Sequence, residues 1–135
     1  MDAHSNTRTF ATLRIIGKAL NPNDVTLKLQ LTPSETKRAG DPRGQAGQWP
    51  HGYWELSSKE QVHSADLADH IAWLVAIIEP SSPGLRQLQL EGLITDIFCF
   101  WETSSSQGGI TINADISRRI GQLNLSLGID IYFAD

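Results

Sequence analysis

Cysteine is nearly absent from this chain, because Cys99 is the only one among its 135 residues. A single cysteine excludes a disulfide within the chain, and proteins without disulfides are typical of reducing compartments. The N-terminal residues also lack the basic start and the apolar core of a secretory signal peptide. We therefore expect a cytoplasmic location.

Long hydrophobic runs and a surplus of positive charge are also missing. The longest apolar run, 71–78, is far shorter than the roughly 20 residues that span a bilayer. Asp and Glu number 15 against 11 Lys and Arg, which gives a net charge of −4. Nucleic-acid binders normally carry a basic surplus instead. We therefore expect neither a membrane nor a nucleic acid as a partner.

Closely spaced metal ligands and catalytic motifs are absent as well. The histidines are His4, His51, His63 and His70. None of them stands one helical turn from another, as the histidines of a zinc-binding helix do. The chain has no Gly-x-Ser-x-Gly motif, and segment 40–44 lacks the Gly-Lys-Ser/Thr ending of a phosphate-binding loop. These absences predict no metal and no cofactor, and they favour a protein that is not an enzyme without deciding the question.

What the sequence does contain is alternation of apolar side chains. In segment 123–133 every second residue is apolar, which predicts a strand with one buried face. Segment 9–17 alternates in the same way, and 53–57 is a shorter strand candidate. Segment 94–103 has bulky side chains on both faces, which is typical of a central strand.

Two signals conflict in segment 21–31. Asn21 can cap a helix, Pro22 suits the first helical position and Asp24 suits the first turn. The apolar residues at 25, 27, 29 and 31, however, alternate as in a strand. We favour a short helix that ends before residue 31, because a cap marks a helix boundary by a specific mechanism.

The clearest helix begins after Ser64, its expected cap, and stops at Pro80. Its apolar residues at 67, 71, 74, 75 and 78 form one stripe. A short helix is expected at 83–90. A turn at 104–109 followed by apolar residues in 110–113 predicts a hairpin with a return strand, and Asp115 is expected to cap the last helix.

These elements predict an α+β fold with a mainly antiparallel sheet and helices packed on one face. The order is β-α-β-α-(α)-β-β-α-β. The length and the hydrophobic content of 40% agree with a single domain over residues 1–135. Within it we expect residues 1–8 to be disordered and 33–52, rich in proline and glycine, to form a long loop.

A set of short segments, taken in order, carries a resemblance to a known family. They are Ala11-Thr-Leu-Arg-Ile-Ile-Gly17, Leu31-Thr-Pro33, Lys37-Arg-Ala-Gly-Asp41, Gly52-Tyr-Trp-Glu-Leu-Ser57, His70-Ile-Ala-Trp-Leu74 and Gly128-Ile-Asp-Ile-Tyr132. Over residues 9–132 the chain resembles the bacterial domain-of-unknown-function 4279 family. The resemblance implies a small cytoplasmic α+β domain with a helix after the first strand. It supplies no activity and no catalytic residues, and the loop between residues 41 and 49 departs from it.

The densest aromatic cluster comprises Trp49, Tyr53 and Trp54, with His51 among them. Tyrosine and tryptophan are frequent at binding hot spots, but they also bury large areas in cores. Alternation along a strand places Tyr53 and Trp54 on opposite faces. We therefore expect one of the two in the core and the other beside Trp49 at the edge of the loop.

Positive charge gathers at Lys37, Arg38 and Arg43 on an otherwise acidic chain. These residues form either a site for an anion or acidic partner or a solvated loop, and we favour the loop. The even-numbered residues 8–14 of the first strand, together with Asp130 and Tyr132, either line a groove or face water. We favour water for that face, since antiparallel sheets allow it.

Asp66 and His70 stand four residues apart on the predicted helix. They are either a carboxylate that orients a general base or a surface pair with His70 packed near Trp73. No nucleophile is visible beside them, so we favour the surface pair. Cys99 lies in an apolar strand and is expected to be a core residue.

The candidate binding residues are therefore Arg38, Arg43, Trp49, His51, Tyr53, His70 and Trp73, with no catalytic residue and no metal ligand assigned. The leading hypothesis is a non-enzymatic module that binds a protein partner through the sheet face and segment 33–54. One form is an immunity-type protein that covers a toxin's active site, since an acidic surface suits a basic nuclease. The alternatives are a small-ligand binder or enzyme with a pocket between loop and sheet, which would use His51 or His70 as base, and a structural homodimer paired through an edge strand.

Overall fold

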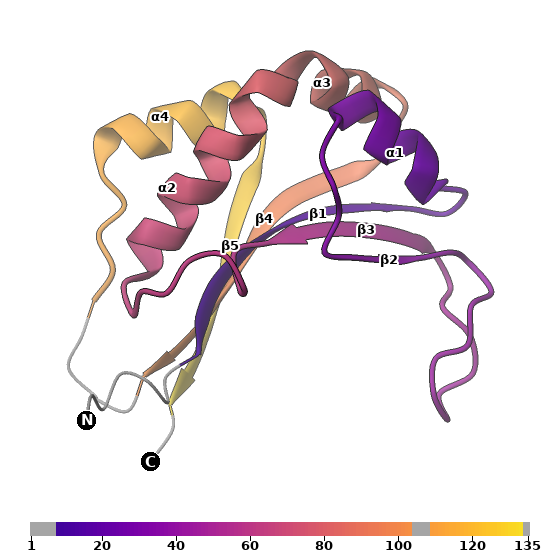
Figure 1. Ribbon diagram of the computed structural model, residues 1–135, viewed down its shortest axis with the longest axis horizontal. Coiled ribbons are helices and arrows are strands. Elements are labelled where there is room, and N and C mark those ends of the chain that lie inside the picture. The colour runs from indigo at the N-terminus through magenta and orange to yellow at the C-terminus, as the bar shows by residue number, and fades with distance from the viewer. Residues whose placement is uncertain (1–7, 104–108, 134–135) are drawn as a thin grey trace.

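The computed structural model of the chain describes residues 8–103 and 109–133, and they form two layers. One layer is a sheet and the other is a set of helices that all lie on the same side of it (Figure 1). The predicted α+β fold, with helices on one face, is confirmed. Of residues 1–8, which were expected to be disordered, 1–7 lie outside the described residues, whereas Arg8 is described and its carbonyl accepts the Glu102 N–H at 2.8 Å.

The sheet has five strands in the order β2-β3-β1-β4-β5. They are β1 (Thr9–Gly17), β2 (Glu35–Lys37), β3 (Gly52–Ser57), β4 (Ile94–Thr103) and β5 (Ser126–Phe133). Neighbouring strands are antiparallel except β4 and β5, which are parallel. The prediction of a mainly antiparallel sheet is confirmed, and so is the position of β4 inside it.

The helices follow the chain across one face of the sheet (Figure 1). They are α1 (Pro22–Leu29), α2 (Leu67–Ile78), the 3-10 turn η2 (Glu79–Ser81), α3 (Ser82–Leu90) and α4 (Ala114–Gln122). The predicted helix at 83–90 is confirmed as α3. Because the helices share one side, they close one face of the sheet and leave the opposite face open.

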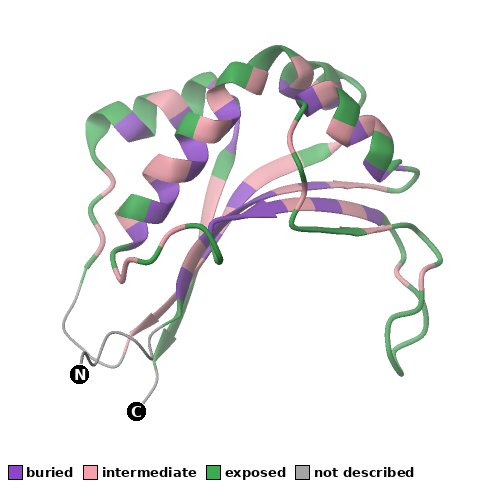
Figure 2. Ribbon diagram, in the orientation of Figure 1, coloured by how far each residue is buried: buried purple, intermediate pink, exposed green. Residues whose placement is uncertain are grey.

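The core lies between the helices and the covered face of the sheet. Figure 2 shows buried residues in the central strands and along α2. Trp54 is the largest of them, and its indole Nε1–H donates to Thr26 Oγ1 of α1 at 3.0 Å. Cys99 is a core residue, as predicted, and burial raises the pKa of its thiol to about 12.

The conflict in segment 21–31 is resolved in favour of the helix. The Asn21 side chain accepts the backbone N–H of Asn23 at 3.0 Å, and Gln30 ends the helix with a positive φ of 56°. Val25 and Leu29, one turn apart, are buried against the core, whereas Leu27 between them is 75% exposed. The alternation of apolar residues was misleading because one of its members faces solvent.

The predicted caps of two helices were wrong. Asp66 caps α2, because its extended backbone lets its carboxylate accept the N–H of Ala68. Ser64 lies before the cap, where its hydroxyl oxygen accepts the N–H of Asp66. Asn113 caps α4 by accepting a backbone N–H at 2.8 Å, and Asp115 stands inside the first turn. In both cases two polar residues compete for the cap, and the backbone geometry decides.

The predicted return strand at 110–113 was also wrong. Ile110 and Ile112 are in extended chain that packs, partly buried, against the core. This segment leads into α4, and α4 returns the chain so that β5 runs parallel to β4. A parallel pair needs such a crossover, whereas a hairpin would have been antiparallel. The turn residues 104–108 lie outside the described residues.

The predicted long loop at 33–52 is shorter than expected. It contains β2, which pairs with β3, and a bridge between Pro42 and Gln48. The Trp49 N–H donates to the Asp41 carbonyl at 2.9 Å, and the Gly40 N–H donates to the Trp49 carbonyl at 2.8 Å. Residues 38–51 are therefore a hairpin-like arm with its own backbone hydrogen bonds.

The final strand departs from the predicted single buried face. β5 begins at Ser126, since Leu123 and Leu125 belong to the end of α4 and the turn after it. Ile129 and Ile131 are 36% and 47% exposed. β5 is the edge of the described sheet, and its second half extends beyond the helices, so alternation alone did not ensure burial (Figure 1).

Candidate binding surface

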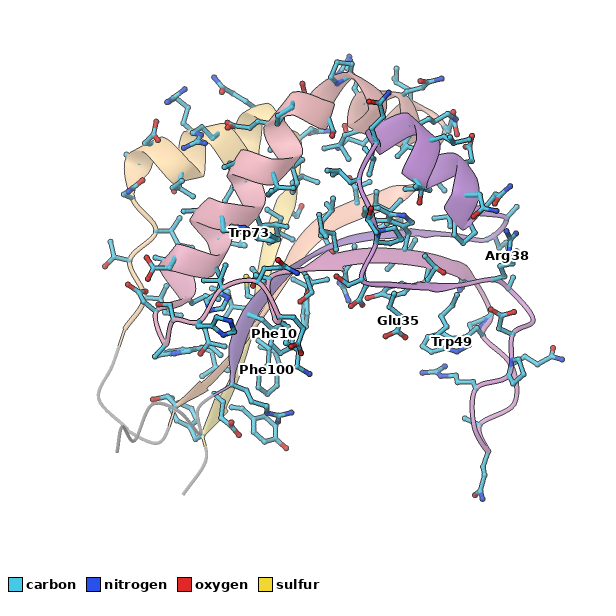
Figure 3. The ribbon with its side chains drawn as sticks, in the orientation of Figure 1. Phe10, Glu35, Arg38, Trp49, Trp73 and Phe100 are labelled. Carbon is cyan, nitrogen blue, oxygen red and sulfur yellow. The ribbon has the colours of Figure 1, made fainter. Side chains whose placement is uncertain are left out.

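The uncovered side of the sheet, which we call the open face, carries aromatic and charged side chains from all five strands. Strand alternation places there the side chains of Phe10, Thr12, Arg14, Ile16, Glu35, Lys37, Tyr53, Glu55, Ser57, Asp96, Phe98, Phe100, Asp130 and Tyr132. Figure 3 shows the labelled Phe10, Phe100, Glu35 and Trp49 on the side of the sheet away from the helices. The arm 38–51 descends from one end of this face (Figure 1).

A row of aromatic rings crosses one end of the open face. Phe10 and Phe100 on neighbouring strands are stacked with centroids 5.5 Å apart and planes within 9°, and Tyr132 follows at 5.7 Å from Phe100. Arg8 and Lys59 place their cations 4.8 Å and 5.6 Å from the Phe100 and Phe10 centroids. Phe10 and Phe100 thus direct their ring faces at each other, and a cation lies over each of these two rings.

A row of charges crosses the middle of the open face, on four strands. The register places Glu35 opposite Glu55, Glu55 opposite Arg14, and Arg14 opposite Asp96. Arg14 donates two hydrogen bonds to the Asp96 carboxylate, at 2.8 Å and 2.7 Å, and lies over the Phe98 ring at 4.4 Å. The hydrogen bond to Asp96 raises the pKa of the Arg14 guanidinium, which shows that Asp96 is the main partner of this cation.

The other end of the charge row has a surplus of carboxylates. Glu55 accepts the Tyr53 hydroxyl at 2.6 Å, and Glu35 pairs with Lys37 at 3.1 Å. Burial, followed by the hydrogen bond to Glu55, raises the pKa of Tyr53, which keeps the phenol protonated as a donor. Among the described residues, no Lys, Arg or His nitrogen forms an ion pair with Glu55.

Trp49 at the base of the arm adds an aromatic wall beside these carboxylates. Its ring stacks on Tyr53 with centroids 6.3 Å apart and planes 15° apart. The Arg43 guanidinium lies over Trp49 at 4.5 Å, and the Lys37 ammonium at 5.9 Å. The predicted separation of Tyr53 and Trp54 is confirmed, because Tyr53 joins Trp49 while Trp54 is buried.

Two adjoining hollows follow from this arrangement. The first, about 400 Å³, lies between the arm and the sheet and is lined by Arg14, Ile16, Glu35, Arg43, Trp49, Pro50, His51, Gly52, Tyr53 and Glu55. The second, about 850 Å³, continues around the edge of the sheet to Trp73 and Ile77 on α2. Both hollows are lined by Arg14, Glu35, Tyr53 and Glu55, so these residues form the shared floor.

The structure brings together only part of the predicted site. Arg43, Trp49, His51 and Tyr53 line the first hollow together, and Trp73 lines the second from the helix side. Arg38 points elsewhere, because its guanidinium donates to the Asn21 side chain at 3.2 Å near the start of α1 (Figure 3). His70 lies in the interior, away from both hollows.

The expected surface pair of Asp66 and His70 was wrong. The His70 Nδ1 is 2.6 Å from Ser58 Oγ, and its Nε2 is 2.7 Å from the Ser64 carbonyl. A carbonyl only accepts, so Nε2 carries the proton and Nδ1 accepts from the Ser58 hydroxyl. Ser58 Oγ also accepts the Ala11 N–H at 2.9 Å. This serine–histidine pair is inaccessible to a substrate, because both residues are buried, and it joins α2 to the sheet.

Glu35 and Glu55 were not predicted as site residues, and the side chains of the first strand were expected to face water. A glutamate in a strand carries no signal of its own, and only the register of β2 on β3 places these two opposite each other. Within residues 8–103 and 109–133, no group of three or more His, Cys, Asp or Glu residues could hold a metal ion. None of the helices in these ranges is long and apolar enough to cross a bilayer.

Comparison with known proteins gives one finding about relationship. Among curated proteins and among solved structures, no significant match to the chain was found. The model of the DUF4279 family, described as a domain of unknown function, matches residues 6–134. That match covers nearly the whole chain, and the chain therefore belongs to the DUF4279 family.

Proposed function

We propose that this protein is a non-enzymatic protein-binding module and that the open face is its binding surface. The observation that carries the proposal is the concentration of ordered aromatic and charged side chains on the one face that the helices leave uncovered. Tyrosine, tryptophan and arginine are enriched at the energetic centres of protein interfaces. Apolar rings gathered on an uncovered face are not needed for solubility, and such patches commonly mark interaction sites.

The geometry of the rings supports a protein partner over a nucleic acid. Proteins that bind single strands present ring faces on which bases stack. Here Phe10 and Phe100 direct their faces at each other, and Arg14 lies over Phe98. The net charge of −4 adds repulsion from a phosphate backbone.

Capture from the lysate of the source cells by the tagged protein tests this function. We expect a stoichiometric protein partner that is retained by the wild type and lost by Phe100→Ala and by Trp49→Ala. The matched controls are Leu27→Ala and Leu90→Ala, which remove exposed apolar side chains from the helix side. The proposal fails if the helix-side variants lose the partner and the open-face variants keep it. It also fails if a second copy of this chain is the only protein retained.

An immunity-type role is the more specific form of this function. It is supported by the small acidic chain, whose charge suits a basic toxin, since complementary charge raises association rates. If this form holds, the captured partner is a basic protein that is toxic when expressed alone, and co-expression of this chain relieves the toxicity. A non-toxic partner would contradict the immunity role but leave the binding module intact.

Binding of a small molecule is the second candidate, and the hollow beside Trp49 favours it. The hollow combines an aromatic wall with both signs of charge, which is typical of small-ligand sites. Native mass spectrometry of freshly purified protein is the test. A retained small molecule that is lost in Trp49→Ala and kept in Leu27→Ala would favour this candidate, whereas a ligand-free spectrum would count against it.

A further inference from the structure

The shared floor of the two hollows brings two carboxylates together. Glu35 and Glu55 are direct cross-strand partners, so their side chains project from the same face of neighbouring strands. Like charges in this position destabilise a sheet. Both carboxylates also line both hollows. An incoming positive charge would relieve their repulsion.

The chain's own cations do not fully neutralise these carboxylates. Arg14 is the cross-strand neighbour of Glu55, yet within the described residues its guanidinium donates both of its hydrogen bonds to Asp96 on the other side. In the same part of the chain, Lys37 forms an ion pair with Glu35 only. Glu55 is half-buried, accepts only the Tyr53 hydroxyl among the side chains described, and lies in reach of solvent through the hollows.

The aromatic wall beside the carboxylates suits a cation as well. The indole of Trp49 already holds one guanidinium, that of Arg43, at 4.5 Å. Arg43 comes from the exposed arm and has no ion-pair partner among the described residues. Aromatic faces next to carboxylates bind the stem and the charged end of a lysine or arginine together.

We propose that a lysine or arginine side chain of a protein partner binds in this floor, with its cation between Glu35 and Glu55 and its stem against Tyr53. This inference rests on the proposed function and adds the chemistry of the partner: a basic segment reaches the hollow. Charge complementarity selects this occupant, since Glu55 has no ion pair among the described residues and the chain as a whole is acidic.

Short peptides test the inference without a partner in hand. The probe is the capped tripeptide Gly-Arg-Gly at millimolar concentration, and the readout is the indole N–H resonance of Trp49 and the amide of Tyr53. The neutral citrulline analogue and the capped tripeptide Gly-Glu-Gly are the matched probes. We expect saturable shifts with the arginine peptide only. Equal shifts with citrulline, stronger shifts with the glutamate peptide, or no shift with arginine would each overturn the inference.

Isosteric variants locate the effect. Glu55→Gln keeps an acceptor for the Tyr53 hydroxyl but removes the charge, and Glu35→Gln does the same on β2. We expect each to weaken the arginine peptide about tenfold, as the loss of one charged hydrogen-bond partner does. Asp130→Asn, on the same face but on β5, changes net charge equally and should leave binding unchanged. Equal weakening by Asp130→Asn would reduce the effect to overall charge and overturn the site.

The same variants separate this inference from the proposed function. If the captured partner is lost in Phe100→Ala but retained in Glu55→Gln and Glu35→Gln, the open face binds a protein and the cation site is wrong. If the arginine peptide binds and no partner depends on Phe100 or Trp49, the cation site holds while the proposed function fails.

Discussion

The two faces of the sheet follow different rules, and adjacent residues of β3 make the comparison. Trp54 on the covered face is buried, and its only polar group donates to Thr26. Tyr53 on the open face stacks on Trp49 and donates to Glu55, a carboxylate without an ion pair among the described residues. The covered face buries its side chains for stability, whereas the open face keeps two glutamates opposite each other, which destabilises a sheet. This difference supports the proposal that the open face is a binding surface.

We expect the largest difference between the two faces when a large side chain is removed from the covered face. Trp54→Ala should lower the free energy of unfolding by about 3 to 5 kcal/mol, because it leaves a cavity and the Thr26 hydroxyl loses a donor. Tyr53→Ala should cost about 1 kcal/mol, since Tyr53 is only half-buried. Urea denaturation measures both. Equal losses would mean that the two faces contribute alike to stability.

The next largest effect concerns the buried histidine. His70→Ala should cost about 2 to 4 kcal/mol, because it opens a cavity and leaves the Ser58 hydroxyl and the Ser64 carbonyl without their partner. The capture of a partner by the open face should be unchanged under conditions where the variant is folded. Loss of partner binding by a folded His70→Ala protein would give His70 a role beyond structure.

The covered face also makes stability depend on alkaline pH, through the buried thiol of Cys99. The pKa of the buried thiol rises from about 9 to about 12, so above pH 9 the unfolded chain releases a proton that the folded chain keeps. The contribution of the Cys99 thiol to the free energy of unfolding should therefore be fully present below its unfolded-state pKa. It should decrease as the pH rises toward the pKa of the folded state. The slope contributed by this group is at most about 1.4 kcal/mol per pH unit. Denaturation series for the wild type and Cys99→Ala should differ by this slope, and parallel series would contradict the cause.

The smallest expected effect lies in the charge row. Asp96→Asn removes the carboxylate that holds Arg14 and frees the guanidinium to turn toward Glu55. The variant removes a negative charge from β4, and it should weaken the arginine peptide about threefold to tenfold by neutralising Glu55. The same titration by nuclear magnetic resonance measures it. Unchanged or tighter binding would contradict this cause, because it would mean that the freed Arg14 does not neutralise Glu55.

The fold was largely predictable because burial imposes a period on the sequence. Alternation identified β1, bulky side chains on both faces identified β4, and the cap at Asn21 identified α1 against a competing pattern. The parallel return of β5 was not predictable, since Ile110 and Ile112 have the composition of a strand but pack as extended chain before α4.

The candidate site was predictable only where residues are close in sequence. Trp49 and Tyr53 are four residues apart, and strand alternation predicted that either Tyr53 or Trp54 would lie beside Trp49. Glu35 and Glu55 meet through strand register, which no local pattern encodes. The spacing of Asp66 and His70 predicted a pair, but the Asp66 carboxylate accepts the Ala68 N–H as the cap of α2, and His70 contacts Ser58 and the Ser64 carbonyl instead.

The position of β1 has a consequence for how the chain folds. This strand comes first among the strands in the chain but lies at the centre of the sheet, with β3 on one side and β4 on the other. Its partner residues on β4 lie far along the chain, as in the pairing of Leu13 with Ile97. Pairings between residues so far apart in the sequence slow folding, because the entropy cost of closing the long loop comes before the stabilising contacts form. During synthesis, one edge of β1 therefore stays without hydrogen-bond partners until β4 has been made. Because unpaired strand edges associate with other chains, we expect the risk of aggregation to be highest in that interval.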